Sequence, residues 1–261
     1  ENFNINSYYE RTYKDSLHQD PMELKGKKYT LYHMLLTEGA EKHELHLCAN
    51  SREVKSYALS TYIPDMKKKL SNGEDAYYYV GYLAGKYLDE AVNTERSDFD
   101  FTDGPMFGDA KESEIVDVAV GYIRAYLKDE LSKAADEKKS QIDILVKTKR
   151  PQYRLLLNRH PDVYSKIPAG LAEDKLDLEL YKHQQQWELD TVKKKHDIEE
   201  KVKQDATSDP SFQKLFDEYC ESITELSRAS LAEYVARRKA VIDLLEQALD
   251  ADENGKYSKE S

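Results

Sequence analysis

The sequence has few cysteines, no net excess of positive charge and no long apolar run, and each of these absences argues against a class of protein. Cys48 and Cys220 are its 2 cysteines and lie far apart, so neither a disulfide framework nor a zinc ribbon is indicated. The formal net charge of −11 argues against a surface that coats DNA, because phosphate binding needs clustered cations. The apolar stretches are too short to span a bilayer. We therefore expect a soluble protein of the reducing cytoplasm with no membrane partner.

The phosphate-loop motif and the paired-histidine metalloprotease motif are also missing. No Gly-x-x-x-x-Gly-Lys phosphate loop occurs. His43 and His46 are three positions apart on an expected strand, where such residues face opposite sides, so we expect no shared metal ion. The sequence begins with Glu1 rather than Met, and we expect it to be an internal segment of a larger protein.

The first part of the chain has the composition of a β-sheet. Tyrosines and β-branched residues in short alternating runs predict strands at residues 29–38, 44–49, 53–59 and 77–84. Asn50-Ser51-Arg52 is a polar turn that joins the second and third of these strands into a hairpin. A short helix is expected between residues 62 and 70, after Pro64. Breakers at residues 102–108 then form a linker.

The second part has the period of helices. A helix is expected from about residue 112 to 127, running on toward residue 145, and a short one at 153–157. Residues 172–204 predict a long polar helix, and Pro210 opens an amphipathic one, so the two are expected to form an antiparallel hairpin. A charged fraction of 34% suits such solvated helices.

These patterns predict an α+β fold, in which a small mixed sheet with flanking helices precedes an elongated helical region. We expect an α+β domain at residues 1–107, connecting helices at 108–170 and a long helical hairpin at 171–261.

Two short segments carry a resemblance to a known family. Asn50-Ser51-Arg52 turns between two expected strands, and Val92-Asn93-Thr94-Glu95-Arg96 follows the strand at 77–84. Residues 28 to about 101 resemble the second, or transducer, domain of the GHKL ATPases, the superfamily of gyrase B, MutL and the ninety-kilodalton heat-shock chaperones. In MutL-like members an Asn-Gly-Arg hairpin turn precedes a strand that ends in Val-Asn-Val, whereas here Ser51 replaces the glycine. The chaperones carry an Asn-x-Ser-Arg loop, to which residues 93–96 are similar.

The resemblance implies a role for Arg96 and Asn93. A cation stabilises the charge that develops when the γ-phosphate of ATP is cleaved, and a cation supplied by a second domain couples hydrolysis to domain closure. By resemblance, Arg96 is this cation and Asn93 shapes its loop. MutL-like proteins instead use a lysine after a His-Pro pair, which is missing after Asn93. The alternative is that Arg96 is a surface charge paired with Glu95 or Asp98.

The resemblance also implies what the chain lacks. GHKL proteins bind ATP and Mg through a separate N-terminal domain, whose metal-binding Asn, acidic catalytic residue and glycine-rich lid motifs are not present together here. We expect that domain of the same parent chain to be the partner. This chain alone is expected neither to bind ATP tightly nor to hydrolyse it.

Two other functions remain open from the sequence. The long polar helices and the single tryptophan, Trp187, suit a protein-interaction module with no nucleotide role, which self-associates through its helices. In that case Trp187 anchors either a neighbouring helix or a partner. The other alternative is a DNA-processing assembly. The segment 147–154 interleaves a tyrosine with four cations that would contact nucleic acid, namely Lys147, Lys149, Arg150 and Arg154.

Overall fold

The computed structural model describes residues 18–71, 73, 75–95, 97–101, 110–204 and 210–249. The fold is α+β, as the sequence predicts: a six-stranded mixed sheet is followed by a long helical region. The chain divides into two compact units. The sheet unit extends to Glu137 and includes Pro168–Gly170, and the helical unit comprises Lys138–Ile167 and the chain from Leu171 onward.

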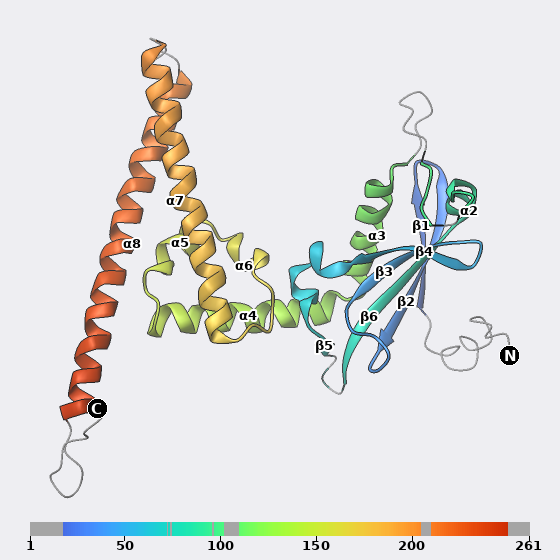
Figure 1. Ribbon diagram of the computed structural model, residues 1–261, viewed down its shortest axis with the longest axis horizontal. Helices are drawn as coiled ribbons and strands as arrows, with labels where there is room; N and C mark the ends of the chain where they lie inside the picture. Colours follow the sequence, from blue (N-terminus) through green and yellow to red (C-terminus); the bar gives the residue numbers. More distant parts are fainter. Residues whose placement is uncertain are drawn as a thin grey trace, which may run out of the picture. The chain divides into compact units, whose positions relative to one another are not determined.

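The sheet has the strand order β1-β2-β6-β3-β4, with β5 paired to β6. Only β3 and β6 pair in parallel among these strands, and the other pairs are antiparallel. The parallel pair brings the carboxyl ends of β3 and β6 to the same edge of the sheet (Figure 1). The strands are β1 (His18–Leu24), β2 (Lys27–Leu36), β3 (Glu44–Ala49), β4 (Arg52–Ala58), β5 (Leu70–Ser71) and β6 (Ala76–Ala84).

Two hairpins of the sheet use left-handed turns. Lys25 and Gly26, between β1 and β2, have φ values of 51° and 74°. Asn50 and Ser51, between β3 and β4, have φ values of 50° and 62°. Two consecutive positive φ angles match the twist of the flanking strands, which is why Asn and Gly are favoured in such turns. Ser51 thus occupies a position that glycine would adopt with less strain.

One face of the sheet forms the core of the sheet unit. Leu83 in β6 lies opposite Leu31 in β2 and Leu47 in β3, and all three side chains are fully buried. They pack with α2 (Lys86–Ala91) and with α3 (Glu112–Tyr126). The helix α3 contributes an apolar stripe of Ile115, Val116, Ala119, Val120 and Ile123.

A glycine makes room in this core for a buried tyrosine. Tyr79 and Gly81 lie on the same face of β6, and a Cβ at position 81 would come within 2.7 Å of the Tyr79 hydroxyl. Because Tyr79 is fully buried, its ring has little freedom to move aside. Position 81 therefore accommodates glycine far better than any other residue.

The helical unit is built around a hairpin of two long helices. The helices α7 (Glu173–Lys203) and α8 (Pro210–Leu249) lie side by side and run in opposite directions (Figure 1). The second part of α4 (Lys128–Thr148), α5 (Tyr153–Arg159) and α6 (Val163–Lys166) complete the unit. None of the described helices has both the length and the apolar character needed to cross a membrane.

Most of the predicted elements are present, with several differences. The predicted helix from residue 112 toward 145 is divided at Leu127 into α3 and α4. The predicted short helix after Pro64 is a 3₁₀ turn at Pro64–Lys67, and another 3₁₀ turn precedes it at Leu59–Thr61. The strands β1 and β5 and the helices α2 and α6 were not predicted. The predicted connecting segment 108–170 is shared between the two units, because its part up to Glu137 belongs with the sheet.

Candidate functional site

The edge of the sheet at which β3 and β6 end collects both segments of the family resemblance. Cys48 near the end of β3 lies opposite Ala84 at the end of β6. The Asn50–Arg52 turn follows β3 directly, and α2 and the segment around Asn93 follow β6. Parallel pairing therefore brings together two segments that are about forty residues apart in the sequence. We call the Asn50–Arg52 turn, α2 and the Asn93–Phe99 segment the loop edge.

A hydrogen bond joins the two halves of the loop edge. The backbone N–H of Asn50 donates to Oδ1 of Asp89 in α2, at a distance of 2.6 Å. Hydrogen bonds from a backbone N–H to a carboxylate are among the stronger ones in proteins. Since α2 also packs against β2 and β3, the helix is fixed to the sheet and the chain leaves it in a defined direction.

Asn93 organises the segment that follows α2. Its side-chain Oδ1 accepts hydrogen bonds from the backbone N–H of Ser97 at 3.0 Å and of Asp98 at 3.4 Å. Its Nδ2 donates to the Ser97 hydroxyl at 3.3 Å, and its backbone N–H donates to the carbonyl of Asp98 at 3.0 Å. One asparagine thus draws the two ends of a short loop together.

The far side of this loop is tied to the sheet. Lys55 in β4 forms ion pairs with Asp98 at 3.1 Å and with Glu112 at the start of α3 at 2.8 Å. A hydrogen bond from the N–H of Phe99, followed by the ammonium of Lys55, holds the pKa of Asp98 below its usual value. Phe99 itself is buried and stacks on Phe101. The loop therefore extends from an anchored base.

The loop edge can present the side chains of Thr94, Glu95 and Ser97 to another molecule. Thr94, Glu95 and Ser97 are exposed. Arg96, the cation implied by the family resemblance, lies outside the described residues. The position of Asn93 agrees with the expectation that it shapes this loop, whereas the role of Arg96 stays a prediction.

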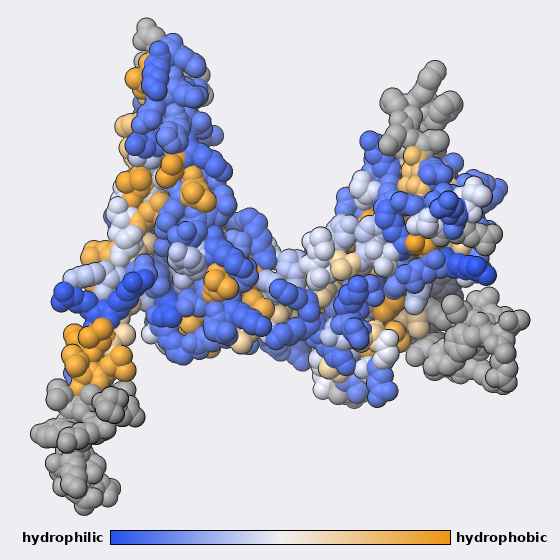
Figure 2. All heavy atoms as spheres, in the orientation of Figure 1, coloured by the Kyte–Doolittle hydropathy of each residue, from blue (hydrophilic) through white to orange (hydrophobic). Residues whose placement is uncertain are grey.

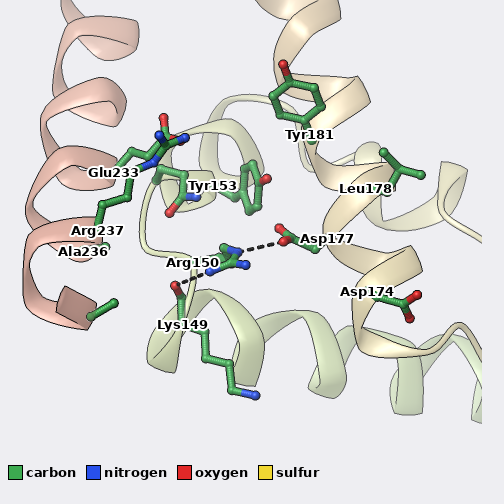
Figure 3. A pocket seen from close by; sticks show the side chains of 12 residues that line it. Lys149, Arg150, Tyr153, Asp174, Asp177, Leu178, Tyr181, Glu233, Ala236 and Arg237 are labelled. Carbon is green, nitrogen blue, oxygen red and sulfur yellow. Dashed lines mark hydrogen bonds and ion pairs between the residues drawn. The ribbon is translucent and has the colours of Figure 1, made fainter. Parts of the chain in front are cut away.

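A pocket of about 540 Å³ lies in the helical unit, among α5, α7 and α8 (Figure 3). On one wall Nε of Arg150 donates to Oδ2 of Asp177 at 2.8 Å. Arg237 and Glu233 of α8, which pair with each other, form the opposite wall. Burial, and then Asp177, raises the pKa of the Tyr153 phenol, so this group is a hydrogen-bond donor at neutral pH.

The pocket bears on the predicted nucleic-acid contact, because Lys149 and Arg150 of that segment line it. Of its four cations, Lys149 is paired with Glu173 at 2.7 Å and Arg150 with Asp177 at 2.8 Å. A phosphate would have to compete with these carboxylates for both side chains. Lys147 and Arg154 are exposed. The nucleic-acid contact stays a prediction, and the paired charges of the pocket do not favour an anion.

Trp187 is part of the core of the helical unit. The side chain is 6% exposed and its ring makes an edge contact with His160 at a centroid distance of 5.4 Å. It belongs to the same buried apolar cluster as Leu176 and Leu180 of α7 and residues of α5. The expectation that it anchors neighbouring helices is confirmed. The alternative was that Trp187 is a hot spot for a partner protein, and that role would need an exposed ring.

A buried polar chain in the sheet unit was not predicted. Nε2 of His33 lies 3.3 Å from Oδ2 of Asp20, and Nδ1 of His33 lies 2.9 Å from the Tyr79 hydroxyl. Desolvation lowers the pKa of His33 to about 4, against the opposing effect of Asp20. Because His33 and Tyr79 are both buried in the core, we assign this chain a structural role. Only the tertiary fold brings these three residues together, so no local sequence pattern predicts their contacts.

His43 and His46 make separate contacts. Nδ1 of His43 accepts from the backbone N–H of Tyr79 at 2.8 Å, whereas the ring of His46 stacks on Tyr82. Among the described residues, no group of three or more His, Cys, Asp or Glu side chains is arranged to hold a metal ion.

Comparison of the chain with protein-family models, with curated proteins and with solved structures finds no match. The loop edge is therefore defined by its own geometry: it is an exposed loop with a fixed base, at the end of a parallel strand pair.

Proposed function

We propose that the sheet unit is a coupling domain of a GHKL-type ATPase and presents Arg96 to ATP bound on a separate N-terminal domain. In this proposal Mg and ATP belong to that domain. The helical unit then receives the movement that follows the nucleotide state. The parent would be an enzyme, and this chain contributes one cation and a mechanical connection to it.

The convergence of the two resemblance segments at the loop edge supports this proposal most strongly. The 2.6 Å hydrogen bond from Asn50 to Asp89 ties the first segment to α2, and the second segment continues directly from that helix. Nothing in the sequence separation of the two segments requires this contact. The closure of the loop by Asn93 and its attachment through Lys55 would hold a neighbouring guanidinium within a narrow range of positions. Such preorganisation is what makes a cation effective against charge that develops during phosphoryl transfer.

The test is Arg96→Ala in a protein in which this chain follows a GHKL nucleotide-binding domain. We expect the rate of ATP hydrolysis to fall by about 100-fold or more, with nucleotide affinity nearly unchanged, because the cation acts on the transition state. Glu95→Ala is the matched control, since this exposed neighbour belongs to the same loop. Equal turnover in the wild type and in Arg96→Ala would remove Arg96 from the mechanism.

The isolated chain gives a second test. We expect the purified chain to show no ATP hydrolysis above background and no tight ATP binding by calorimetry. Robust turnover by this chain would overturn the assignment of the ATP site to another domain.

A protein-interaction module without a nucleotide role is the second candidate function. Exposed apolar side chains along α7 and α8 favour it (Figure 2). Titration of the chain into the ATPase domain separates the two candidates. A change in hydrolysis rate supports the coupling domain, and self-association without any such change supports the interaction module.

A further inference from the structure

An exposed apolar stripe runs along α8. Its members follow one another at intervals of 7, 11, 7 and 4 residues, each close to a whole number of helical turns. They are between 42% and 56% exposed. Figure 2 shows hydrophobic residues gathered in the C-terminal part of this helix. We call this set the α8 stripe: Phe216, Ile223, Tyr234, Val241 and Leu245.

The α8 stripe is distinct from the face that α8 packs against the rest of the unit. That face carries Ser222 and Ala229, which are 2% and 1% exposed. At 100° per residue they lie roughly a third of a turn away from the stripe. Small residues suit close helix packing, whereas the stripe carries large side chains that the described chain covers only in part, for example where Phe216 stacks on Phe212 and Arg238 lies over the Tyr234 ring. A row of large apolar side chains, with Ser227 and Ser230 between Ile223 and Tyr234, is typical of a helix face that packs against a partner.

We propose that the α8 stripe binds the α8 stripe of a second copy of this chain, with the two helices antiparallel. The spacing of the stripe is nearly symmetric about the Arg228–Ala229 peptide. Centred there, the antiparallel pair places Phe216 opposite Val241 of the second copy, and Ile223 opposite Tyr234. Each contact then occurs twice, as two-fold symmetry requires.

The charges of α8 distinguish the antiparallel pair from a parallel one. Asp217, Glu218 and Glu221 lie in the first half of the helix, and the cationic segment 237–239 in the second. A parallel pair in register would place the cationic segment 237–239 of one copy against the same cationic segment of the other. The antiparallel pair places it level with residues 218–220 of the second copy, next to Asp217. Opposite charges then face each other, which selects orientation and register.

Some of these carboxylates already have partners. Glu218 pairs with Lys194 and Glu221 with Arg159 in the same unit. Asp217 accepts a hydrogen bond from the amide of Gln213 at 2.8 Å, so its charge is not neutralised there. Asp217 is therefore the carboxylate that gains most from Arg238 of a second copy.

The area of the contact is sufficient for a dimer. From Phe212 to Leu245 the helix is roughly 50 Å long, and a helix face is about 10 Å wide. The pair would bury roughly 500 Å² on each copy, about 1,000 Å² in total, which reaches the lower bound of specific interfaces. We therefore expect a dimer that dissociates on dilution.

The first experiment measures the mass of the full chain by sedimentation between about 1 and 100 µM, as the area estimate suggests. The wild type should pass from monomer to dimer, and Ile223→Lys/Tyr234→Lys should stay monomeric. Leu189→Lys/Val192→Lys is the matched control, because both side chains are more than half exposed on α7. It should still dimerise, and circular dichroism should show equal helix content in all three proteins. A monomeric wild type, or a dimeric stripe variant, overturns the proposal.

The second experiment determines the orientation. In a Cys48→Ser/Cys220→Ser background, Ile223→Cys and Tyr234→Cys variants are oxidised separately and as a mixture. The antiparallel pair predicts a disulfide only in the mixture, because two copies of residue 223 would lie roughly 16 Å apart. Cross-linking of Ile223→Cys with itself would instead show a parallel pair and overturn the proposed register.

A charge reversal gives a final check. Arg238→Glu should weaken the dimer several-fold, and adding Asp217→Arg should restore it. Failure of the second change to restore the dimer would contradict the proposed contact. None of these outcomes depends on Arg96, so the dimer and the coupling function succeed or fail separately.

Discussion

The sheet unit and the helical unit differ in how completely they bury their apolar side chains. Among the described large hydrophobic residues that are exposed, only Leu35 belongs to the sheet unit, and the others lie in α4, α7 and α8. The sheet unit buries most of its large apolar side chains between one sheet face and two helices. The helical unit has a compact core around Trp187 and then extends beyond it.

This difference shows which unit is complete by itself. A domain that buries its apolar surface gains its stability internally, whereas a helix with an uncovered apolar stripe gains stability from a partner. The sheet unit should therefore behave as an independent folded domain. The helical unit should change its stability with concentration, because association stabilises the folded state by mass action.

Of the changes that test whether the two units are independent, Leu83→Ala should have the largest effect on stability. Leu83 is fully buried between β2 and β3, and truncation of such a leucine costs about 2–5 kcal/mol through lost burial and a cavity. Trp187, the chain's single tryptophan, reports only on the helical unit. We expect urea unfolding followed by near-UV dichroism of the tyrosines to shift, while the fluorescence transition of Trp187 stays in place.

Leu244→Ala is the matched control for that change. Leu244 is 65% exposed in α8, so its truncation should alter stability by no more than about 0.5 kcal/mol. If Leu83→Ala displaces both transitions equally, the two units unfold together and their independence is disproved.

The pH dependence of unfolding should have the next largest effect. The unfolded chain takes up a proton on His33 near the ordinary pKa of 6.5, whereas the folded chain does so only near a pKa of about 4, because burial disfavours the imidazolium. Between these two pKa values, His33 is protonated in the unfolded state and neutral in the folded state. Stability is therefore fully present above pH 6.5 and falls as the pH decreases, by about 3 kcal/mol at pH 4.

Chemical denaturation at pH 7, 6, 5 and 4 measures this loss. His33→Gln should flatten the dependence of the sheet transition, leaving the smaller contribution of His43, whose pKa burial also lowers. His196→Gln, at an exposed position of α7, should leave it unchanged. An equally steep loss in His33→Gln would show that another group takes up the proton.

The fold was largely accessible from the sequence because its strongest signals are local. Alternation in residues 77–84 and the polar turn at Asn50-Ser51 act within a few residues, and the structure has both features. The strand β1 was missed because Pro21 and its charged neighbours do not resemble a strand; as an edge strand it tolerates them. The helix α2 is six residues long and owes its formation to packing on the sheet.

The candidate site could be predicted from the sequence only in part. The sequence identified Asn93 as a loop-forming residue, and its hydrogen bonds to Ser97 and Asp98 agree with that interpretation. It gave no sign of the bond from Asn50 to Asp89, which depends on the parallel pairing of β3 with β6. The ion pair of Arg150 with Asp177 likewise joins residues 27 positions apart in sequence and follows from tertiary packing alone.

Asp89→Ala should have the smallest effect and tests how firmly the loop edge is built. The donor on Asn50 is a backbone N–H in a turn that the sheet already fixes, so the hydrogen bond costs little side-chain entropy and its loss should reduce stability by about 1 kcal/mol. Asp190→Ala is the matched change in the helical unit. Asp190 contacts Lys193 and Gln186, whose long side chains lose freedom when they bind it.

The Asp190 pair is exposed to solvent, and alanine also favours the helix, so Asp190→Ala should be neutral within about 0.5 kcal/mol. Urea unfolding of each unit, read as in the Leu83 experiment, compares the two substitutions. Equal effects would mean that the Asn50–Asp89 bond is no stronger than a surface ion pair. In that case the loop edge would be too loosely held to position a guanidinium for catalysis, since a displacement of about 1 Å is enough to impair it.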